Sequence, residues 1–275
     1  MTNNLPFTLD ESGPVSYLTF DTGLPVWLAF STRKGGVSRP PFVSANMAYH
    51  VGDDPGSVAE NRRRLAAAVC SCRDVPLYTA SQVHGCHVLP VNRGMPIGEL
   101  EKQPADSLVT ADRGILLGIM TADCLPVLLI DRKLRAVAAV HAGWRGIMAR
   151  IVPRTVAAMK KLHGIAAVDL LVVLGPCIGR CCYQVGEELV REFAAQPPFA
   201  ADSTWYEQAS GDYHLDLVQL QALQLREAGV PPAALAVASR CTACENFFFS
   251  YRREHGITGR QIALVGLTDG ENARG

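Results

Sequence analysis

Apolar residues along this chain gather in short runs that are separated by glycine, proline and aspartate. Short apolar runs bounded by turn-forming residues are typical of buried β-strands rather than of long helices. We therefore predict strands at residues 26–30, 88–91, 115–121, 127–130, 136–140, 170–174 and 262–267. Most of the polar residues fall between these runs, as expected for buried strands.

Between the apolar runs lie segments in which apolar residues recur at the spacing of a helix. We predict helices over residues 55–70, 144–163, 185–194 and 216–228. Asp54 and Pro55 supply an N-cap and a proline at the first helical position of the first helix. Gly164 and Gly229 follow the second and fourth helices as stop signals. Pro153 is expected to kink or interrupt the second helix, because proline lacks the amide hydrogen that a helix interior uses.

Strands that alternate with helices favour a layered α/β (α+β) fold. We find no internal repeat, low-complexity tract or long linker in the 275 residues, which is a length that one large domain can reach. The chain is therefore predicted to form a single domain over residues 1–275. The segment 269–275 is expected to fray.

Composition and charge narrow the classes of function. The chain has 26 basic and 26 acidic side chains, so no net field attracts nucleic acid or an anionic membrane. No apolar run approaches the roughly 20 residues that span a bilayer. The N-terminus lacks a secretory signal, and nine cysteines form an odd number, which favours reduced thiols. We expect a cytoplasmic, soluble protein that binds neither nucleic acid nor membrane.

One thiol and two imidazoles stand at the edges of apolar runs. Cys124 lies in Thr-Ala-Asp-Cys-Leu-Pro, while His84 and His141 lie in Gln-Val-His-Gly and Val-His-Ala-Gly-Trp. Three such ligands with an open fourth position are typical of a catalytic zinc site. The alternative is that the cysteine fills the core and that the histidines are satisfied core residues.

The other cysteines give weaker signals. Cys241 and Cys244 form a Cys-x-x-Cys pair that lacks a second pair or a nearby pair of histidines, so we interpret it as structural. Cys177, Cys181 and Cys182 lie among glycines, where they pack or serve a redox role, although adjacent cysteines fit ordinary disulfide geometry poorly.

Two segments combine cations with glycine or hydroxyl groups, at residues 32–38 and 250–261. Backbone amides and guanidinium groups in such segments suit an anionic ligand. The alternative is solvated surface charge. Phosphate-loop, dinucleotide-binding, nucleophile-elbow and His-Glu-x-x-His motifs do not occur in the sequence, which removes several classes of enzyme.

From about residue 31 to residue 267 the chain resembles the polyphenol oxidase (laccase-domain) family of zinc-dependent purine nucleoside phosphorylases. The resemblance rests on blocks at residues 31–38, 52–55, 60–62, 82–85, 121–126, 141–145 and 248–253. It implies a layered α/β/β/α sandwich with mixed sheets. It also places the zinc ligands of the family on His84, Cys124 and His141, which are the residues that the chemistry had selected.

The resemblance implies phosphorolysis of adenosine, inosine, guanosine and 5′-methylthioadenosine, with deamination of adenosine at the same site. Purine nucleosides and inorganic phosphate are thus the expected partners, Zn²⁺ is the expected cofactor with Cu²⁺ possible in vitro, and the protein is expected to be a monomer or homodimer. Zinc with an open position can polarise a substrate oxygen or activate water.

Further site residues follow from the chemistry and the resemblance together. Phosphate or nucleoside is expected to contact Arg33, Asn46, Arg62, Arg145 and Arg252, because guanidinium forks match phosphate oxygens. Asp123 or Glu188 would protonate the leaving base or orient a ligand histidine. The chain has Gln184 where the family often carries glutamate, and Ser81 where a charged residue is frequent, so no carboxylate role is carried over to residue 184.

Other functions remain open at this point. In a thiol hydrolase Cys124 would be the nucleophile and His141 its base. A copper-dependent polyphenol oxidase is another alternative, although the seven histidines form none of the His-x-His pairs of multicopper enzymes. A single copper could still replace zinc at such ligands. A non-enzymatic interaction module is the last alternative.

Overall fold

Two six-stranded mixed sheets form the centre of the protein. The computed structural model describes residues 7–71, 75–209 and 211–269. The first sheet has the order β1 (Phe7–Asp10), β2 (Tyr17–Phe20), β3 (Val26–Ser31), β15 (Gln261–Leu267), β7 (Leu116–Thr121) and β4 (Leu77–Tyr78). The second has the order β14 (Leu235–Val237), β10 (Leu170–Leu174), β8 (Leu125–Asp131), β9 (Val137–Ala142), β6 (Ser107–Thr110) and β5 (Val88–Pro90). Most neighbours are antiparallel, but β4 with β7, β5 with β6 and β10 with β14 are parallel.

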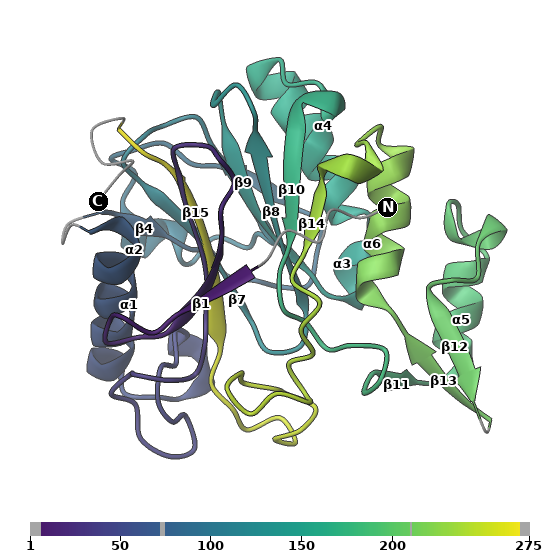
Figure 1. The fold of residues 1–275 in the computed structure, drawn as a ribbon, viewed down its shortest axis with the longest axis horizontal. Coiled ribbons are helices and arrows are strands. Elements are labelled where there is room, and N and C mark those ends of the chain that lie inside the picture. Colours follow the sequence, from purple (N-terminus) through teal and green to yellow (C-terminus); the bar gives the residue numbers. More distant parts are fainter. Residues whose placement is uncertain (1–6, 72–74, 210, 270–275) are drawn as a thin grey trace.

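Helices cover the outer faces of these sheets (Figure 1). They are α1 (Pro55–Cys70), α2 (Ile97–Leu100), α3 (Trp144–Met148), α4 (Ile151–His163), α5 (Glu187–Ala194) and α6 (Leu217–Glu227), with short 3₁₀ turns at Tyr49–Val51, Ala167–Asp169, Phe199–Ala201 and Pro232–Ala234. A small sheet with the order β11 (Gln184–Val185), β13 (Asp212–Leu215) and β12 (Tyr206–Ala209) lies with α5 beside α6, away from the two large sheets.

Strand alternation explains the layers. In β8, Leu128 packs into the core between the two sheets, whereas Leu129 packs into the core beneath α3, α4 and α6. In β15, Val265 faces the core between the sheets and Leu264 faces the core beneath α1. Since side chains alternate between faces along a strand, a strand covered on both sides must be apolar throughout. This is why these strands appear as continuous apolar runs.

The predicted fold class is confirmed, because the order of layers is helix, sheet, sheet, helix. Each of the predicted strands overlaps an observed one, and α1 has the predicted bounds, with the Asp54 side chain accepting a hydrogen bond from the Ser57 amide. The single domain over residues 1–275 stays a prediction. Beyond Asp269, the segment that was expected to fray lies outside the described residues.

The structure corrects the helix that was predicted over residues 144–163. It consists of α3 and α4, and the break falls at Ala149 and Arg150, where Arg150 has a left-handed φ of 64°. Pro153 lies in the first turn of α4, where amides have no partner within the helix, so proline is tolerated there. The helix predicted from residue 185 begins at Glu187 instead, because Gln184 and Val185 pair with β13.

No helix in the described ranges is both long and apolar enough to cross a membrane.

Candidate functional site

The hairpin of β8 and β9 brings Cys124 and His141 together. Cys124 immediately precedes β8, and the register pairs Leu125 with Ala142. Gly143 therefore follows β9 directly beside Cys124. A Cβ atom on Gly143 would lie 2.8 Å from the Cys124 sulfur and 3.3 Å from His84 Cδ2, so glycine is the residue that leaves room for both. His84 itself occupies a turn with a φ of 57°.

The three predicted ligands form one group. The ligand atoms of His84, Cys124 and His141 lie within 4.8 Å of one another, and Cys124 Sγ is 4.0 Å from His84 Nε2. The two imidazole rings meet edge to face, with centroids 4.7 Å apart. A thiol and two imidazoles at these separations fit a soft or borderline transition metal such as zinc or copper, rather than calcium or magnesium.

Asp106, which sequence reasoning missed, holds the two histidines in place. Its buried carboxylate contacts His141 Nδ1 at 2.7 Å and accepts hydrogen bonds from the backbone amides of Val83, His84 and Gly85. Because Nδ1 of His141 is occupied, Nε2 is left for a metal. Asp106 thus fixes both the turn that carries one ligand and the ring orientation of the other.

Charge within the group favours the ligand form of the thiol. Burial disfavours a thiolate, but the neighbouring imidazoles of His141 and His84 outweigh this effect and lower the pKa of Cys124 to about 6. Burial likewise disfavours a charged His141, but Cys124 and Asp106 raise its pKa to about 9. In the metal-free protein the pair is therefore a thiolate beside an imidazolium, and a cation that binds the thiolate would displace the proton.

The three residues open into a cavity of about 460 Å³. Its other walls carry three arginines (Arg145, Arg252 and Arg260) and three aromatic side chains (Trp144, Tyr183 and Tyr251), together with His50 and Gln82. The volume is in the range of small-molecule sites. Cations and aromatic rings around a metal-capable group suit a ligand that has both an anionic part and a flat ring.

Ion pairs divide the arginines into two sets. Arg33 pairs with Glu254, and Arg62 pairs with Glu101 at 2.6 Å, so acidic partners already compensate both charges. Neither residue lines the cavity. Arg145 and Arg252 line it, and neither forms an ion pair within the part of the chain that the structure describes. The structure thus brings two of the four predicted arginines to the cavity.

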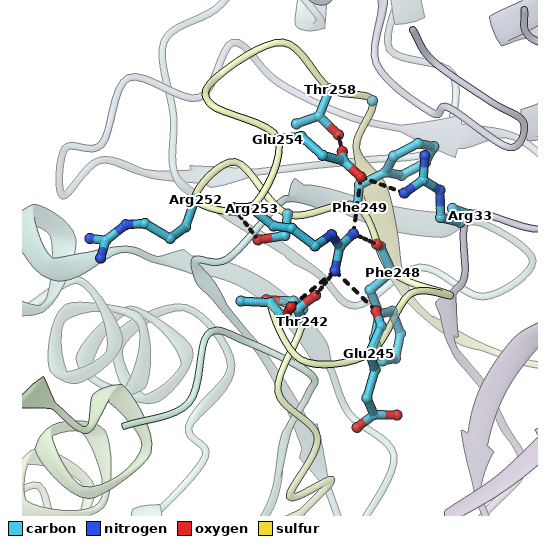
Figure 2. A network of polar contacts seen from close by, with 12 residues as sticks. Arg33, Thr242, Glu245, Phe248, Phe249, Arg252, Arg253, Glu254 and Thr258 are labelled. Atoms are coloured by element: carbon cyan, nitrogen blue, oxygen red, sulfur yellow. Dashed lines mark hydrogen bonds and ion pairs between the residues drawn. The ribbon is translucent and has the colours of Figure 1, made fainter. Parts of the chain in front are cut away.

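Arg252 and Arg253 have different surroundings although they are adjacent. Arg253 lies at the centre of a network and donates to the carbonyls of Thr242, Ala243, Glu245 and Phe248, whereas Arg252 extends away from that network (Figure 2). The Arg252 guanidinium donates to the Cys182 and Gln184 carbonyls beside the cavity.

Asp123 lines the cavity, but its carboxylate is occupied by the protein. It accepts hydrogen bonds from the hydroxyls of Thr242 and Ser250 and from the Arg252 amide. It has a φ of 90°, an uncommon value for a residue with a side chain. These bonds hold the turn that presents Cys124.

Two further predicted residues lie outside the lining of the cavity. Glu188 is exposed on α5, and its carboxylate folds back over Gly186. Asn46 is fully buried, where it donates to Asp53 and the Ala48 carbonyl and accepts from the Arg260 amide. Asn46 therefore supports the segment that carries Arg260.

Sequence reasoning missed several lining residues. Arg260 lay within the segment at 250–261 that was singled out for anions, but it was not chosen. Trp144 lies inside the family block at residues 141–145, and Tyr183 directly follows Cys181 and Cys182. Neither was assigned a role. His50 gave no signal in the sequence. Partial burial, together with the charges of Arg260 and Arg62, lowers the pKa of this cavity-lining imidazole.

The chain is similar to known proteins in both sequence and fold. Residues 27–268 match the family model described as multi-copper polyphenol oxidoreductase laccase. The chain is 38% identical to the purine nucleoside phosphorylase YlmD of Geobacillus stearothermophilus over 86% of this chain and 88% of the relative. It is 39% identical to the purine nucleoside phosphorylase YfiH of Escherichia coli, over 86% and 92%. The crystal structure of the Bacillus licheniformis hypothetical protein YfiH matches with a TM-score of 0.88 at 31% identity, over 96% of this chain and 99% of that one.

Proposed function

Because the chain belongs to the multi-copper polyphenol oxidoreductase laccase family, and relatives that it matches over most of their length are named purine nucleoside phosphorylases, we propose that it cleaves purine nucleosides with phosphate. The observation that carries the proposal is a single cavity in which arginines and aromatic rings surround the His84, Cys124 and His141 group. The finer proposal is that adenosine, inosine, guanosine and 5′-methylthioadenosine are substrates and that adenosine is also deaminated.

We propose that His84, Cys124 and His141 hold one zinc ion and that Asp106 orients them. When bound, zinc supplies a Lewis acid that polarises a substrate oxygen or acidifies a water molecule. The metal-free thiolate and the Asp106 contact to His141 Nδ1 support this assignment, since both prepare ligand atoms for a cation. Asp106 also accepts a hydrogen bond from His141 Nδ1, so the ring presents its other nitrogen to the cavity.

Phosphate is assigned to the arginines without acidic partners. Arg145 is exposed at the cavity, and its guanidinium stacks 4.3 Å from the Trp144 ring centroid and has no hydrogen-bonded partner within the described chain. Its donors are free to bind a dianion, which needs charged donors to offset its desolvation. Arg252 and Arg260 donate to backbone carbonyls, which fixes the direction of their remaining donors.

The purine is assigned to the aromatic walls. Trp144, Tyr183 and Tyr251 offer flat apolar surfaces in the cavity, and such surfaces stack on nucleobases. We propose that Asp123 is a positioning residue, because its carboxylate accepts three hydrogen bonds from the protein, and that it keeps the Cys124 turn and Arg252 together. Phosphorolysis then requires phosphate and purine to be held on opposite sides of the sugar carbon that reacts.

A specific observation favours thiol chemistry as the second candidate. Cys124, His141 and Asp106 form the order of nucleophile, base and orienting acid that cysteine hydrolases use, and the pKa of Cys124 is lowered to about 6. The second imidazole, His84, lies 4.0 Å from the same sulfur and has no place in such a triad. A metal site accounts for all three side chains.

Multicopper oxidase chemistry has less support. Such enzymes need several copper sites built largely from histidine. All seven histidines lie in the described ranges, and His84 and His141 are the two that join a metal-capable group there. Of zinc and copper, we propose zinc at this one group.

The decisive experiment incubates metal-replete protein with adenosine, with and without inorganic phosphate, and separates adenine, inosine and ribose 1-phosphate. With phosphate we expect ribose 1-phosphate in an amount equal to adenine plus hypoxanthine, because inosine formed by deamination is itself a proposed substrate. Without phosphate we expect inosine alone. Absence of turnover on adenosine, inosine, guanosine and 5′-methylthioadenosine would contradict the proposal. A modified Cys124 after iodoacetamide treatment of metal-replete protein, without a chelator, would favour the thiol hydrolase. The cytoplasmic location and the monomeric or homodimeric state stay predictions.

A further inference from the structure

A second group of potential metal ligands lies outside the site described above. It consists of Cys181, Cys182, Cys241 and Cys244, whose sulfur atoms all lie within 4.8 Å of one another. Cys181 Sγ and Cys182 Sγ are 3.5 and 3.4 Å from Cys244 Sγ. Adjacent cysteines in one loop thus meet a Cys-x-x-Cys pair in another loop, about 60 positions later in the chain. We refer to these four residues as the four-cysteine cluster.

The geometry points to a bound zinc ion in the four-cysteine cluster, and we propose that this ion is structural. Tetrahedral zinc with Zn–S bonds of about 2.3 Å places its sulfurs about 3.8 Å apart. The separations of 3.5 and 3.4 Å from Cys244 Sγ lie slightly below that value, and all four sulfurs lie within 4.8 Å of one another. Iron–sulfur clusters hold their cysteines farther apart, because several atoms lie between the ligands. The separations therefore match one ion rather than a cluster of metals.

Simple packing does not explain the cluster. Free cysteines are usually buried as small apolar side chains. Here Cys181 and Cys244 are exposed, and Cys182 and Cys241 are only partly buried. Four thiols that meet at the surface gain little from the hydrophobic effect, so another interaction is needed to account for their convergence.

Disulfide bonds also fit poorly. The Cys244 sulfur lies at nearly equal distances from the sulfurs of Cys181 and Cys182, and a disulfide bond would use only one of them. A bond between Cys181 and Cys182 themselves would join adjacent residues, which strains ordinary disulfide geometry. A tetrahedral ion uses all four sulfurs equally.

The surrounding backbone is built to accept thiolates. The Gly179 amide donates to Cys241 Sγ at 3.2 Å, and amide hydrogens that point at sulfur are a common outer shell of metal thiolates. A Cβ atom on Gly179 would lie 3.3 Å from Cys181 Sγ and 3.4 Å from Cys241 Sγ, so glycine permits this close approach.

The thiols of the four-cysteine cluster differ in acidity. Burial disfavours a Cys241 thiolate, but the amides of Gly179 and Cys244 outweigh that effect and lower its pKa. Burial and the neighbouring thiols raise the pKa of Cys181 to about 11 and also raise the pKa of Cys182. A divalent metal bound between the four sulfurs would offset the charge of the thiolates that it binds.

The position of the cluster gives the ion a structural role. It would join the loop between β10 and β11, which contributes Ile178 and Tyr183 to the cavity, to the loop between β14 and β15, which contributes Arg252. Two further contacts tie the same loops to the site, since Arg252 donates to the Cys182 carbonyl and Thr242 donates to Asp123 at 2.6 Å. A structural zinc at this point would fix one wall of the cavity. The inference does not depend on the proposed reaction.

The test measures metal content of protein expressed with added zinc. We expect two zinc equivalents in the wild-type protein, one in Cys124→Ala and one in the double variant Cys241→Ser with Cys244→Ser. Cys86→Ser removes a thiol from neither group and should retain two. A double variant that keeps as much zinc as the wild type, or Cys124→Ala protein that contains iron or no metal, would overturn the inference.

Two further measurements remain decisive if the double variant fails to fold. Cobalt bound to Cys124→Ala protein should give the intense near-ultraviolet charge-transfer bands of several thiolates and the visible bands of a tetrahedral ion. Thiol titration of the denatured wild-type chain, with chelator and without reductant, should find all nine thiols. A shortfall of two thiols would show a disulfide bond, and cobalt bands typical of nitrogen and oxygen ligands would likewise overturn the assignment.

Discussion

Cys124 lies beside two imidazoles, and these outweigh burial and lower its pKa to about 6. We predict that Cys124→Ala lowers nucleoside turnover by more than about 100-fold, because even an altered outer partner of a metal ligand costs about 10- to 100-fold. Unfolding by urea should change by about 1 kcal/mol or less, since the side chain is only partly buried. Activity assays and metal analysis check this together.

The alternative outcomes for Cys124→Ala are distinct. A variant that keeps near-normal activity without zinc at this site would refute a metal mechanism. A variant that keeps that zinc but loses activity would restore the thiol nucleophile.

Arg145 is the arginine with the clearest assignment to phosphate. We predict that Arg145→Met depresses phosphorolysis by roughly 10- to 100-fold, because a charge-assisted hydrogen bond contributes about 1.5–3 kcal/mol. Deamination should change much less, since phosphate takes no part in it. Rates of adenine and inosine formation by the same samples give the comparison.

Arg154 provides the matched control, because it is exposed on α4 and donates to the Ala149 carbonyl away from the cavity. Arg154→Met should leave both rates near those of the wild type. Equal losses of phosphorolysis and deamination in Arg145→Met would instead assign Arg145 to nucleoside binding or folding.

At the scale of elements, the turn between β8 and β9 depends on one buried carboxylate. Asp131 accepts hydrogen bonds from the amide and guanidinium of Arg135, and its side chain has 0% exposure. Burial would raise its pKa, but the bonds from Arg135 outweigh burial and lower the pKa from 3.8. The carboxylate therefore stabilises the fold above the unfolded pKa, and this contribution is lost as pH falls through the lower folded pKa.

We predict that Asp131→Asn reduces the free energy of unfolding by about 1–3 kcal/mol at pH 7. The difference from the wild type should shrink as the pH falls below about 4. Urea unfolding of metal-free protein at pH 7, 5 and 3.5 measures it without a contribution from metal release. Asp21→Asn, at an exposed turn, serves as the control. A difference that stays constant with pH would contradict the role of the Asp131 charge.

The elements explain which site residues the sequence could reveal. Cys124 and His141 lie at the ends of apolar runs, and a strand end is visible in the sequence, whereas His84 lies in a turn between β4 and β5. Asp106 was missed because its role depends on β6 pairing with β9, and a residue pattern does not specify long-range pairing. The kink assigned to Pro153 was wrong because the nearby left-handed Arg150 ends the preceding helix first.

The four-cysteine cluster and the arginines also depend on contacts between residues far apart in the sequence, which a residue pattern does not specify. Cys241 and Cys244 lacked a second pair in sequence, but the fold supplies one in Cys181 and Cys182. Arg33 appeared suited to phosphate, yet its carboxylate partner, Glu254, lies 221 positions away. Whether a charge is free or compensated follows from tertiary contacts, which short motifs do not contain.

At the scale of the whole molecule, the two sheets are apolar on both faces. Leu128 and Leu129 are adjacent in β8, both have 0% exposure, and they face different cores. We predict that Leu128→Ala and Leu129→Ala each reduce the free energy of unfolding by about 2–5 kcal/mol. Urea unfolding of both variants checks this.

In a sheet with one face in solvent, one of two adjacent residues would be exposed, and its replacement by alanine would cost little stability. A loss below about 1 kcal/mol in either variant would therefore contradict the four-layer arrangement. Leu162→Ala, at an exposed position of α4, should change stability by no more than about 0.5 kcal/mol and serves as the control.

During translation, β15 is synthesised after the other strands of the first sheet. β15 comes last among the strands, yet it lies between β3 and β7 and pairs with both. A nascent chain that has reached residue 200 already contains His84, Cys124 and His141, but it exposes the unpaired edges of β3 and β7 and lacks the cavity wall at residues 251–260. The ribosome must therefore release nearly the whole chain before the first sheet can close, and until then those two edges are open to pairing with other chains.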